Sequence, residues 1–369
     1  MEPDLFKYVP SEIMSNIFSR LHSEAVAISK CVCKAWLHLL ETDYFVNSYL
    51  CKPSLAVLAR DSTRLTVFNL KDEDEDEDGV DHDHDRHYIP VADFDIPQRG
   101  AKVKGTSANG LLLVFSKPKS LCICNPLTRD YVELCCPQQS IRASELLCGF
   151  GVSKISGRHK VVCMTRSESH CHVYTLGATQ TWRTVAKPSG VFCDYAYGVS
   201  FGQLVKGNLH WKLWGEAICC FDVETECFSR FSTPPRGGNA DLSVLQGCLC
   251  ACRLAWDKDE GNEVIEIWLM KEYGDDESWS KEYVMIYHPD FPPGPAIYPI
   301  KVFKDGDILM LLEEEFLLYY SNNTKNTQQV HALEAATGDT YISAIIFTPT
   351  LSSLKTLGME NVISLNSIS

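Results

Sequence analysis

The first fifty residues carry apolar positions at helical spacing. Ile13, Ile17 and Leu21 recur every four positions shortly after Pro10, and proline is tolerated at the start of a helix. Further apolar positions in this region keep a spacing of three or four: Met14, Phe18, Ala25, Ile28, Val32, Ala35, Trp36, Leu39 and Leu40. The pattern therefore predicts two or three short helices.

So few helices bury little core by themselves. The apolar face of these helices is also wider than packing of the helices against one another requires. The extra apolar residues indicate that another surface covers them. We interpret this surface as a partner protein. The alternative is that the helices form a cap packed on the rest of the same chain.

From about residue 51 onward the pattern changes to short apolar runs separated by turns, which is typical of strands. A strand–turn–strand unit, clearest at 109–114, 121–125 and 131–134, recurs about every fifty residues, the spacing of kelch-like propeller blades. The residues that precede the repeated turn are Asn69, Asn125, Leu176, Asp222, Met270 and Tyr320. A fourth strand is expected in front of each later unit, near Val103, Leu146, Val199, Val244 and Ile300.

The first unit has no strand in front of it, whereas 342–347 is an apolar strand left over behind the last unit. If this strand completes the first blade, the ring closes and its sheet edges are paired. The sequence thus predicts a small all-α module over residues 1–50, followed by an all-β, six-bladed kelch-like propeller over residues 51–369 with an acidic insertion at 71–87.

Most of the negative charge is concentrated in one segment. The formal net charge is −14, and ten acidic residues against two basic ones lie between Lys71 and Arg86. This sign argues against a nucleic-acid-binding protein. His82, His84 and His87 within the run could bind a divalent metal, but such runs are usually solvated loops. We therefore expect no metal site and no cofactor-binding site.

The cysteines indicate a reducing compartment. The chain has 17 of them, with no secretion signal and no apolar run long enough to span a membrane. No pair of cysteines has the spacing of a zinc site, and Cys248, Cys250 and Cys252 alternate on one strand face, which predicts core packing. We expect a cytoplasmic or nuclear location, or both, and no membrane partner.

Several stretches resemble plant F-box proteins. Val-Pro-Ser-Glu-Ile at 9–13 and Cys-Val-Cys-Lys-Ala-Trp at 31–36, with apolar residues between and beyond them, look like an F-box. Five later stretches resemble the F-box-associated domain, whose family includes kelch-type and S-locus-like members: 107–112, 125–129, 207–211, 221–226 and 267–274. Two positions depart from the family pattern, because Val9 replaces a leucine and His22 replaces a proline.

The resemblance implies the substrate-recognition subunit of an SCF-type (Skp–cullin–F-box) ubiquitin ligase. The F-box would bind a Skp-type adaptor and through it a cullin, and the propeller would hold a target protein for ubiquitination and proteasomal degradation. The adaptor-binding residues that carry over are Val9, Pro10, Ile13, Ile17, Leu21, Ala25, Val32, Cys33 and Trp36. Trp36 is either a binding hot spot or part of the helices' own core.

Two other functions remain as alternatives. The first is an F-box protein that scaffolds or sequesters its partner without delivering it for degradation. The second is a hydrolase with Ser200 as nucleophile, because 198–202 matches the Gly-x-Ser-x-Gly pattern. That motif requires a helix after the serine, and a strand-like segment follows here, so we expect no catalytic residues.

The tryptophans are expected to pack between blades, with one or two lining a target groove. They are Trp182, Trp211, Trp214, Trp256, Trp268 and Trp279.

Overall fold

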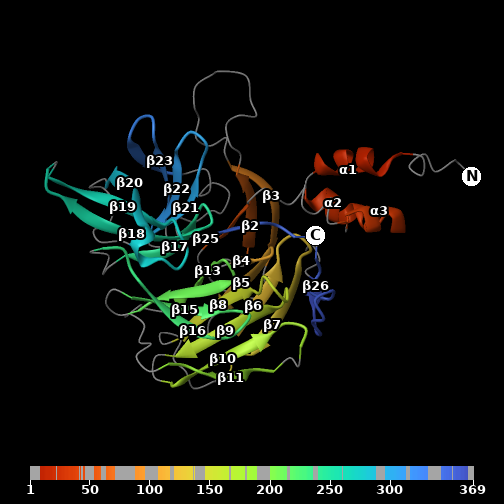
Figure 1. Cartoon of the computed structure of the whole chain (residues 1–369). Coiled ribbons are helices and arrows are strands. Elements are labelled where there is room, and N and C mark those ends of the chain that lie inside the picture. Colours follow the sequence, from red (N-terminus) through yellow and green to blue (C-terminus); the bar gives the residue numbers. More distant parts are fainter. Residues whose placement is uncertain are drawn as a thin grey trace, which may run out of the picture.

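A computed structural model provides the fold (Figure 1). It describes residues 9–21, 23–40, 42, 45, 54–59, 64–70, 88–95, 107–116, 120–135, 137, 146–165, 168–178, 181–188, 200–213, 217–235, 240–259, 261–287, 296–312, 316–330, 342–350 and 352–364. The acidic segment 71–87, including His82, His84 and His87, lies outside the described residues.

Three short helices precede the sheets. They are α1 (Ser11–Ser19), α2 (Ser23–Ser29) and α3 (Lys34–Leu40). Pro10 occupies the N-cap of α1, as its position in the sequence predicts. Among the described helices, none has both the length and the apolarity that a membrane span requires.

The strands form six sheets arranged as the blades of a propeller. From the inner strand outward, blade 1 consists of β25 (Ile342–Phe347), β1 (Ser54–Ala59), β2 (Arg64–Leu70) and β3 (Tyr88–Asp95). Blade 2 consists of β4 (Ser107–Ala108), β5 (Leu111–Ser116), β6 (Ser120–Asn125), β7 (Asp130–Cys135) and β26 (Ile363–Ser364). Blade 3 consists of β12 (Ser200–Phe201), β8 (Leu146–Val152), β9 (His159–Thr165), β10 (His170–Thr175) and β11 (Arg183–Ala186).

Blades 4 to 6 each have four strands. Blade 4 consists of β13 (Gln203–Val205), β14 (Asn208–Lys212), β15 (Ala217–Asp222) and β16 (Phe228–Ser232). Blade 5 consists of β17 (Asp241–Leu245), β18 (Cys248–Asp257), β19 (Asn262–Met270) and β20 (Trp279–Ile286). Blade 6 consists of β21 (Ile297–Val302), β22 (Ile308–Leu312), β23 (Phe316–Ser321) and β24 (Asn326–Gln329). A short 3₁₀ helix, Asp276–Ser278, precedes β20.

The last long strand closes the ring, which confirms the predicted closure and the six blades. β25 pairs antiparallel with β1, with Leu55 opposite Ile346 and Ala59 opposite Ile342. A buried apolar cluster fills each contact between neighbouring blades. The strands predicted near Val103 and Val199 lie outside the described residues; the first described inner strands there are β4 at Ser107 and β12 at Ser200.

Beyond β25 the chain continues over blade 2 to blade 3 and back. This C-terminal strap, residues 348–350 and 352–364, first contacts the β4–β5 turn, where a Cβ on Gly110 would come within 2.6 Å of Thr350. The amide of Asn125 then donates to the carbonyl oxygens of Thr350 and Ser352, at 3.0 and 2.8 Å. The strap continues to blade 3 and returns as β26, which pairs with β7.

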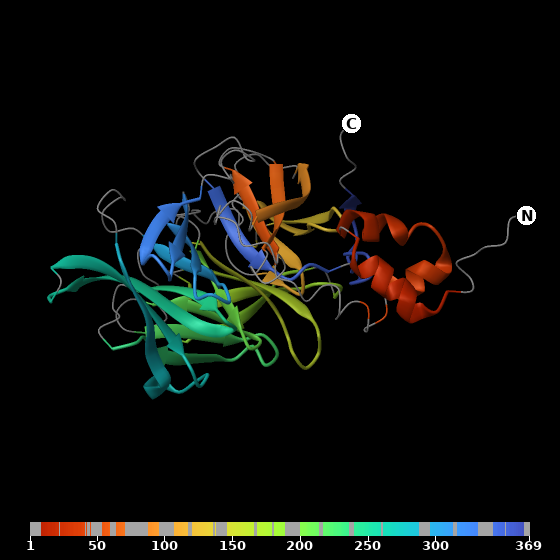
Figure 2. The same cartoon turned by 90° about the horizontal axis from the view of Figure 1, so that it is seen from above.

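The helices form a separate small cluster beside blades 1 and 2 (Figures 1 and 2). Their core consists of Met14, Phe18, Val26, Leu40 and Phe45, and one propeller residue, Leu127 in the β6–β7 turn, joins it. Asn125 shapes that turn, because its side-chain oxygen accepts from the backbone N–H groups of Leu127 and Thr128. One turn therefore anchors both the strap and the helices.

Candidate functional site

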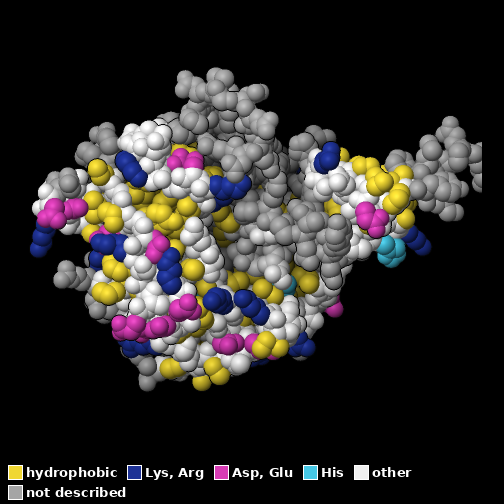
Figure 3. Space-filling view, turned by 45° about the horizontal axis from the view of Figure 1, so that its top comes forward, with side chains coloured by type: hydrophobic (Ala, Val, Ile, Leu, Met, Phe, Trp, Pro, Cys, Tyr) yellow, Lys and Arg dark blue, Asp and Glu magenta, His cyan; other side chains and the backbone are white. Residues whose placement is uncertain are grey.

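An open apolar surface lies on the helices. Ile13, Ile17, Ile28 and Val32 are 53, 46, 62 and 58% exposed, and we call them the apolar helical face. Apolar side chains gather on the part of the helical group that points away from the propeller (Figure 3). On α1, Met14 and Phe18 enter the core, whereas Ile13 and Ile17 remain in solvent.

The nine residues predicted to bind an adaptor divide into two groups. Five are exposed: Pro10, Ile13, Ile17, Val32 and Cys33. Four are half-buried: Val9, Leu21, Ala25 and Trp36. The ring of Trp36 packs edge-on against Phe18, with 4.8 Å between centroids, so Trp36 supports the helical core while part of its surface stays accessible.

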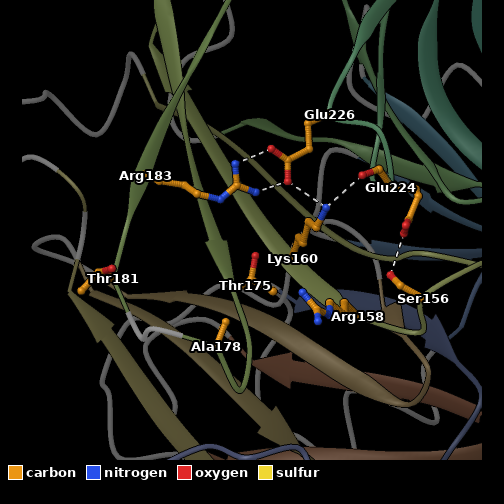
Figure 4. Close-up of a pocket in the computed structure, with 9 residues that line it drawn as sticks. All are labelled: Ser156, Arg158, Lys160, Thr175, Ala178, Thr181, Arg183, Glu224 and Glu226. Carbon is orange, nitrogen blue, oxygen red and sulfur yellow. Dashed lines mark hydrogen bonds and ion pairs between the residues drawn. The ribbon is translucent and has the colours of Figure 1, made fainter.

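A charged pocket of about 630 Å³ lies between blades 3 and 4 (Figure 4). Its lining comes from the β8–β9, β10–β11 and β15–β16 connections and adjacent strand ends: Ser156, Arg158, Lys160, Thr175, Ala178, Thr181, Arg183, Glu224 and Glu226. The strap passes close by, because a Cβ on Gly177 would come within 2.0 Å of the Leu357 carbonyl oxygen.

Glu226 is the centre of the pocket's ion pairs. Arg183 binds its carboxylate with two N–H groups, and the buried ammonium of Lys160 lies 2.8 Å from it. Burial alone would raise the pKa of Glu226, but the hydrogen bonds from Arg183 and Lys160 outweigh burial and lower it. Glu226 therefore stays ionised and joins blade 4 to blade 3.

The other carboxylate of the pocket is also engaged. Hydroxyl groups of Ser153 and Ser156 donate to Glu224, and these hydrogen bonds lower its pKa. Within the described residues no ion pair involves the exposed guanidinium of Arg158. The pocket can thus offer one cation to an acidic group of a ligand, while its remaining charges hold the blades together.

Buried polar contacts also connect blade 4 to blade 5. His210 is fully buried, and its two ring nitrogens lie 3.1 Å from the Gln203 carbonyl oxygen and 2.9 Å from the Tyr273 hydroxyl. Burial lowers the pKa of His210 to about 4. The imidazole is therefore neutral at pH 7, which suits one nitrogen donating to Gln203 and the other accepting from Tyr273.

Three tryptophans bridge blades, as predicted. The indole N–H groups of Trp182, Trp211 and Trp279 each donate to a backbone carbonyl of the preceding blade, at 2.7, 3.0 and 3.0 Å. Trp268 is half-buried beside Arg253 and Lys281. Trp256 is 63% exposed near the end of β18, and Trp214 lies outside the described residues.

Ser200 occupies a strand rather than a turn before a helix. It lies on β12, which pairs in parallel with β8, and β13 begins at Gln203. A Cβ on Gly202 would come within 2.5 Å of the Trp211 ring, so the glycine allows close packing. This segment does not have the geometry of a nucleophile elbow.

Metal-ligating side chains come together at one place in the part of the chain that the structure describes. They are Glu168, His170 and His172, at the start of β10. No metal site was expected here from the sequence, although the alternation of His170 and His172 places both side chains on one face of a strand, which is a signal for such a site. Cys250 and Cys252 are fully buried in the core between blades 5 and 6, as predicted.

The fold and these surfaces define a closed six-bladed propeller that carries a small helical group. Residues 54–349 match the F-box associated beta propeller domain, and the chain belongs to this family. The predicted resemblance to plant F-box proteins is thus confirmed.

Three relatives from Arabidopsis thaliana illustrate the similarity. Putative F-box protein At1g47730 is 25% identical over 85% of this chain and 82% of its own length. F-box protein At3g07870 is 27% identical, with 85 and 83% covered, and F-box protein CPR1 is 25% identical, with 86 and 83% covered. The solved structure of dihydro-heme d1 dehydrogenase NirN is similar only at a TM-score of 0.33 and 11% identity, with 75 and 72% covered.

Proposed function

We propose that this chain is the substrate-recognition subunit of an SCF-type ubiquitin ligase. Residues 1–50 would act as the F-box that docks on a Skp-type adaptor, and through it on a cullin. Residues 51–369 would hold the target protein. Membership in the F-box associated family and relatives named as F-box proteins support this proposal.

The observation that carries the proposal is the apolar helical face. Single exposed apolar residues are common on protein surfaces. Here four β-branched side chains, each about half exposed or more, lie within twenty residues of a helical group whose described residues form one small core. Covering such a surface with an adaptor removes apolar area from water and stabilises the complex.

The propeller suits the role of holding a target because interactions between neighbouring blades make it rigid. The tryptophan hydrogen bonds and the Glu226 ion pairs cross between sheets, and β25 closes the ring. A rigid body between two binding surfaces raises the effective concentration of a target near the conjugating enzyme. No chemistry by this chain is needed, and we propose a non-catalytic protein that works in the cytoplasm, the nucleus or both.

Adaptor binding can be tested with one substitution on each part of the molecule. Ile17→Asp places a charge on the apolar helical face, and Ile155→Asp makes the same change at an 84% exposed position on the propeller. Binding to a purified Skp-type adaptor should weaken at least tenfold for Ile17→Asp and stay unchanged for Ile155→Asp. Equal affinities for the two variants would refute the adaptor role of the helices.

The degradative role needs a second experiment. Targets captured with residues 51–369 should accumulate when the proteasome is inhibited, and their half-lives should lengthen when the Ile17→Asp chain replaces the native one. Captured partners whose half-lives respond to neither change would instead favour the scaffolding or sequestering role.

A further inference from the structure

The start of β10 brings together three side chains of the kind that bind transition metals. His170 and His172 are two positions apart on the strand, so their rings lie on the same face. The ring centroids are 5.1 Å apart and the planes nearly perpendicular. Glu168 precedes the strand, and one potential ligand atom from each of the three residues lies within 4.8 Å of the others.

Two of these ligand atoms lack a hydrogen-bond partner among the described residues. Glu168 Oε2 and His172 Nε2 are both buried, and the 3.7 Å between them is too long for a hydrogen bond. The side chains are only 18 and 8% exposed. Buried polar atoms without partners are unfavourable and rare, so this pair calls for an explanation.

A bound metal ion satisfies both atoms at once. Zinc binds histidine nitrogen and carboxylate oxygen at about 2.0–2.2 Å, so two ligands of a tetrahedral site lie about 3.3–3.6 Å apart. The 3.7 Å separation of the Glu168 and His172 atoms is close to this value. Two imidazoles and one carboxylate form a common ligand set for zinc and its neighbours in the first transition series.

The backbone around the cluster is fixed by hydrogen bonds. The N–H of Glu168 donates to the Thr165 hydroxyl at 3.3 Å, and the N–H of Lys187 donates to the Ser169 carbonyl at 2.9 Å. The ammonium of Lys187 is held by the Thr165 carbonyl oxygen at 2.6 Å. These hydrogen bonds hold the backbone at Glu168 and Ser169, directly before the strand that carries His170 and His172.

We propose that Glu168, His170 and His172 form a binding site for a divalent transition-metal ion of the zinc type. The ion joins the turn before β10 to the strand itself and so stabilises blade 3. Three protein ligands leave a fourth position open to water. The site is independent of the ubiquitin-ligase role.

The test uses the full chain with His82→Asn, His84→Asn and His87→Asn, which removes the histidines of the acidic segment as competing ligands. Titration with Zn²⁺ alone should show one equivalent bound and a higher midpoint of thermal unfolding, since a ligand of the native state stabilises it. Co²⁺ should give the visible absorption of a tetrahedral site. In that background, Glu168→Gln and His172→Gln should each lower the Zn²⁺ affinity at least tenfold.

His38→Gln, at an exposed position on α3, is the matched control and should leave the affinity unchanged. If His172→Gln fails to fold, Glu168→Gln, which keeps the shape of the side chain, and His170→Asn, at a half-buried position, provide the same comparison. Absence of Zn²⁺ binding in the background chain, or equal affinity in the Glu168→Gln variant and its parent, would overturn the proposal.

Discussion

The helical group and the propeller differ in how completely they bury their apolar side chains. Among the described residues, four large exposed apolar side chains lie between Ile13 and Val32, whereas five are spread between Ile155 and Ile363. Each contact between blades has its own buried apolar cluster. The described helices form one small cluster, which also includes Leu127 from the β6–β7 turn of the propeller. The propeller encloses its apolar side chains between its own blades, whereas the helical group leaves four of its large apolar side chains exposed.

The largest effect should follow from removing the strand that closes the ring. A chain that ends at residue 341 lacks β25 and exposes the edge of β1, where Leu55, Ala56 and Val57 are fully buried. Open sheet edges promote association. We expect the truncated chain to aggregate and to lose its cooperative thermal transition, as measured by light scattering and circular dichroism.

A chain that ends at residue 364 is the control for this truncation, because it keeps β25 and the described strap. It should remain monomeric with the native transition. A monomeric, cooperative chain ending at 341 would mean that the propeller does not need its closing strand.

Two phenylalanine substitutions compare the cores directly. Phe18 in the helices and Phe221 in blade 4 are 2 and 0% exposed, and Phe→Ala at such sites costs about 3–5 kcal/mol. Phe18→Ala should abolish adaptor binding and leave the main unfolding transition unchanged. Phe221→Ala should lower that transition. If both variants shift the same transition equally, the two regions unfold as one unit.

Acid should weaken the propeller through His210. Its native pKa is about 4, whereas an unfolded histidine has a pKa near 6.5. Between these values the unfolded chain takes up a proton that the native one does not, so the free energy of unfolding falls as pH drops from about 6.5 to about 4. The full contribution is about 3 kcal/mol.

Urea denaturation at several pH values measures this slope. His210→Gln should be less stable than the native chain at pH 7 and should lose part of the decline between pH 6.5 and 4. An unchanged slope in His210→Gln would show that this imidazole does not carry the effect.

The smallest effect should come from the turn that joins the two regions. Asn125→Ala removes side-chain hydrogen bonds to the strap and to the N–H groups of Leu127 and Thr128, at about 2 kcal/mol in total. Thermal unfolding should shift accordingly, and amide hydrogens of the strap should exchange faster. Asn322→Ala, at an exposed position in the corresponding turn of blade 6, should change little. Equal shifts would contradict the special role of Asn125.

The ring was predictable because its signals are local. Each blade repeats the same alternation of apolar residues and the same turn positions, and closure follows from counting strands. The strap was not predictable, because its attachment depends on contacts such as Asn125 with Ser352, which are remote in sequence and follow no period. The pocket is similar in this respect, since Lys160 and Glu226 meet only when two blades pack in register.

The apolar helical face was predictable in part. Periodicity identified the apolar positions, and Ile13, Ile17 and Val32 belong to the predicted adaptor-binding set and are exposed. Ile28 is the most exposed of the four but is not in that set. A wide apolar arc does not show which of its residues face the helical core and which face solvent. Met14 and Ile13 are adjacent apolar residues, and only the direction of their side chains makes one buried and the other exposed.

The position of β25 also sets an order of events during synthesis. Helices α1–α3 end at Leu40, and the strand that completes blade 1 ends at Phe347. At about 5–20 residues per second, the ribosome delivers that strand about 15–60 seconds after the helices. The helices are therefore synthesised well before the ring can close. If the proposed function holds, the nascent chain could bind its adaptor before the propeller is able to bind a target.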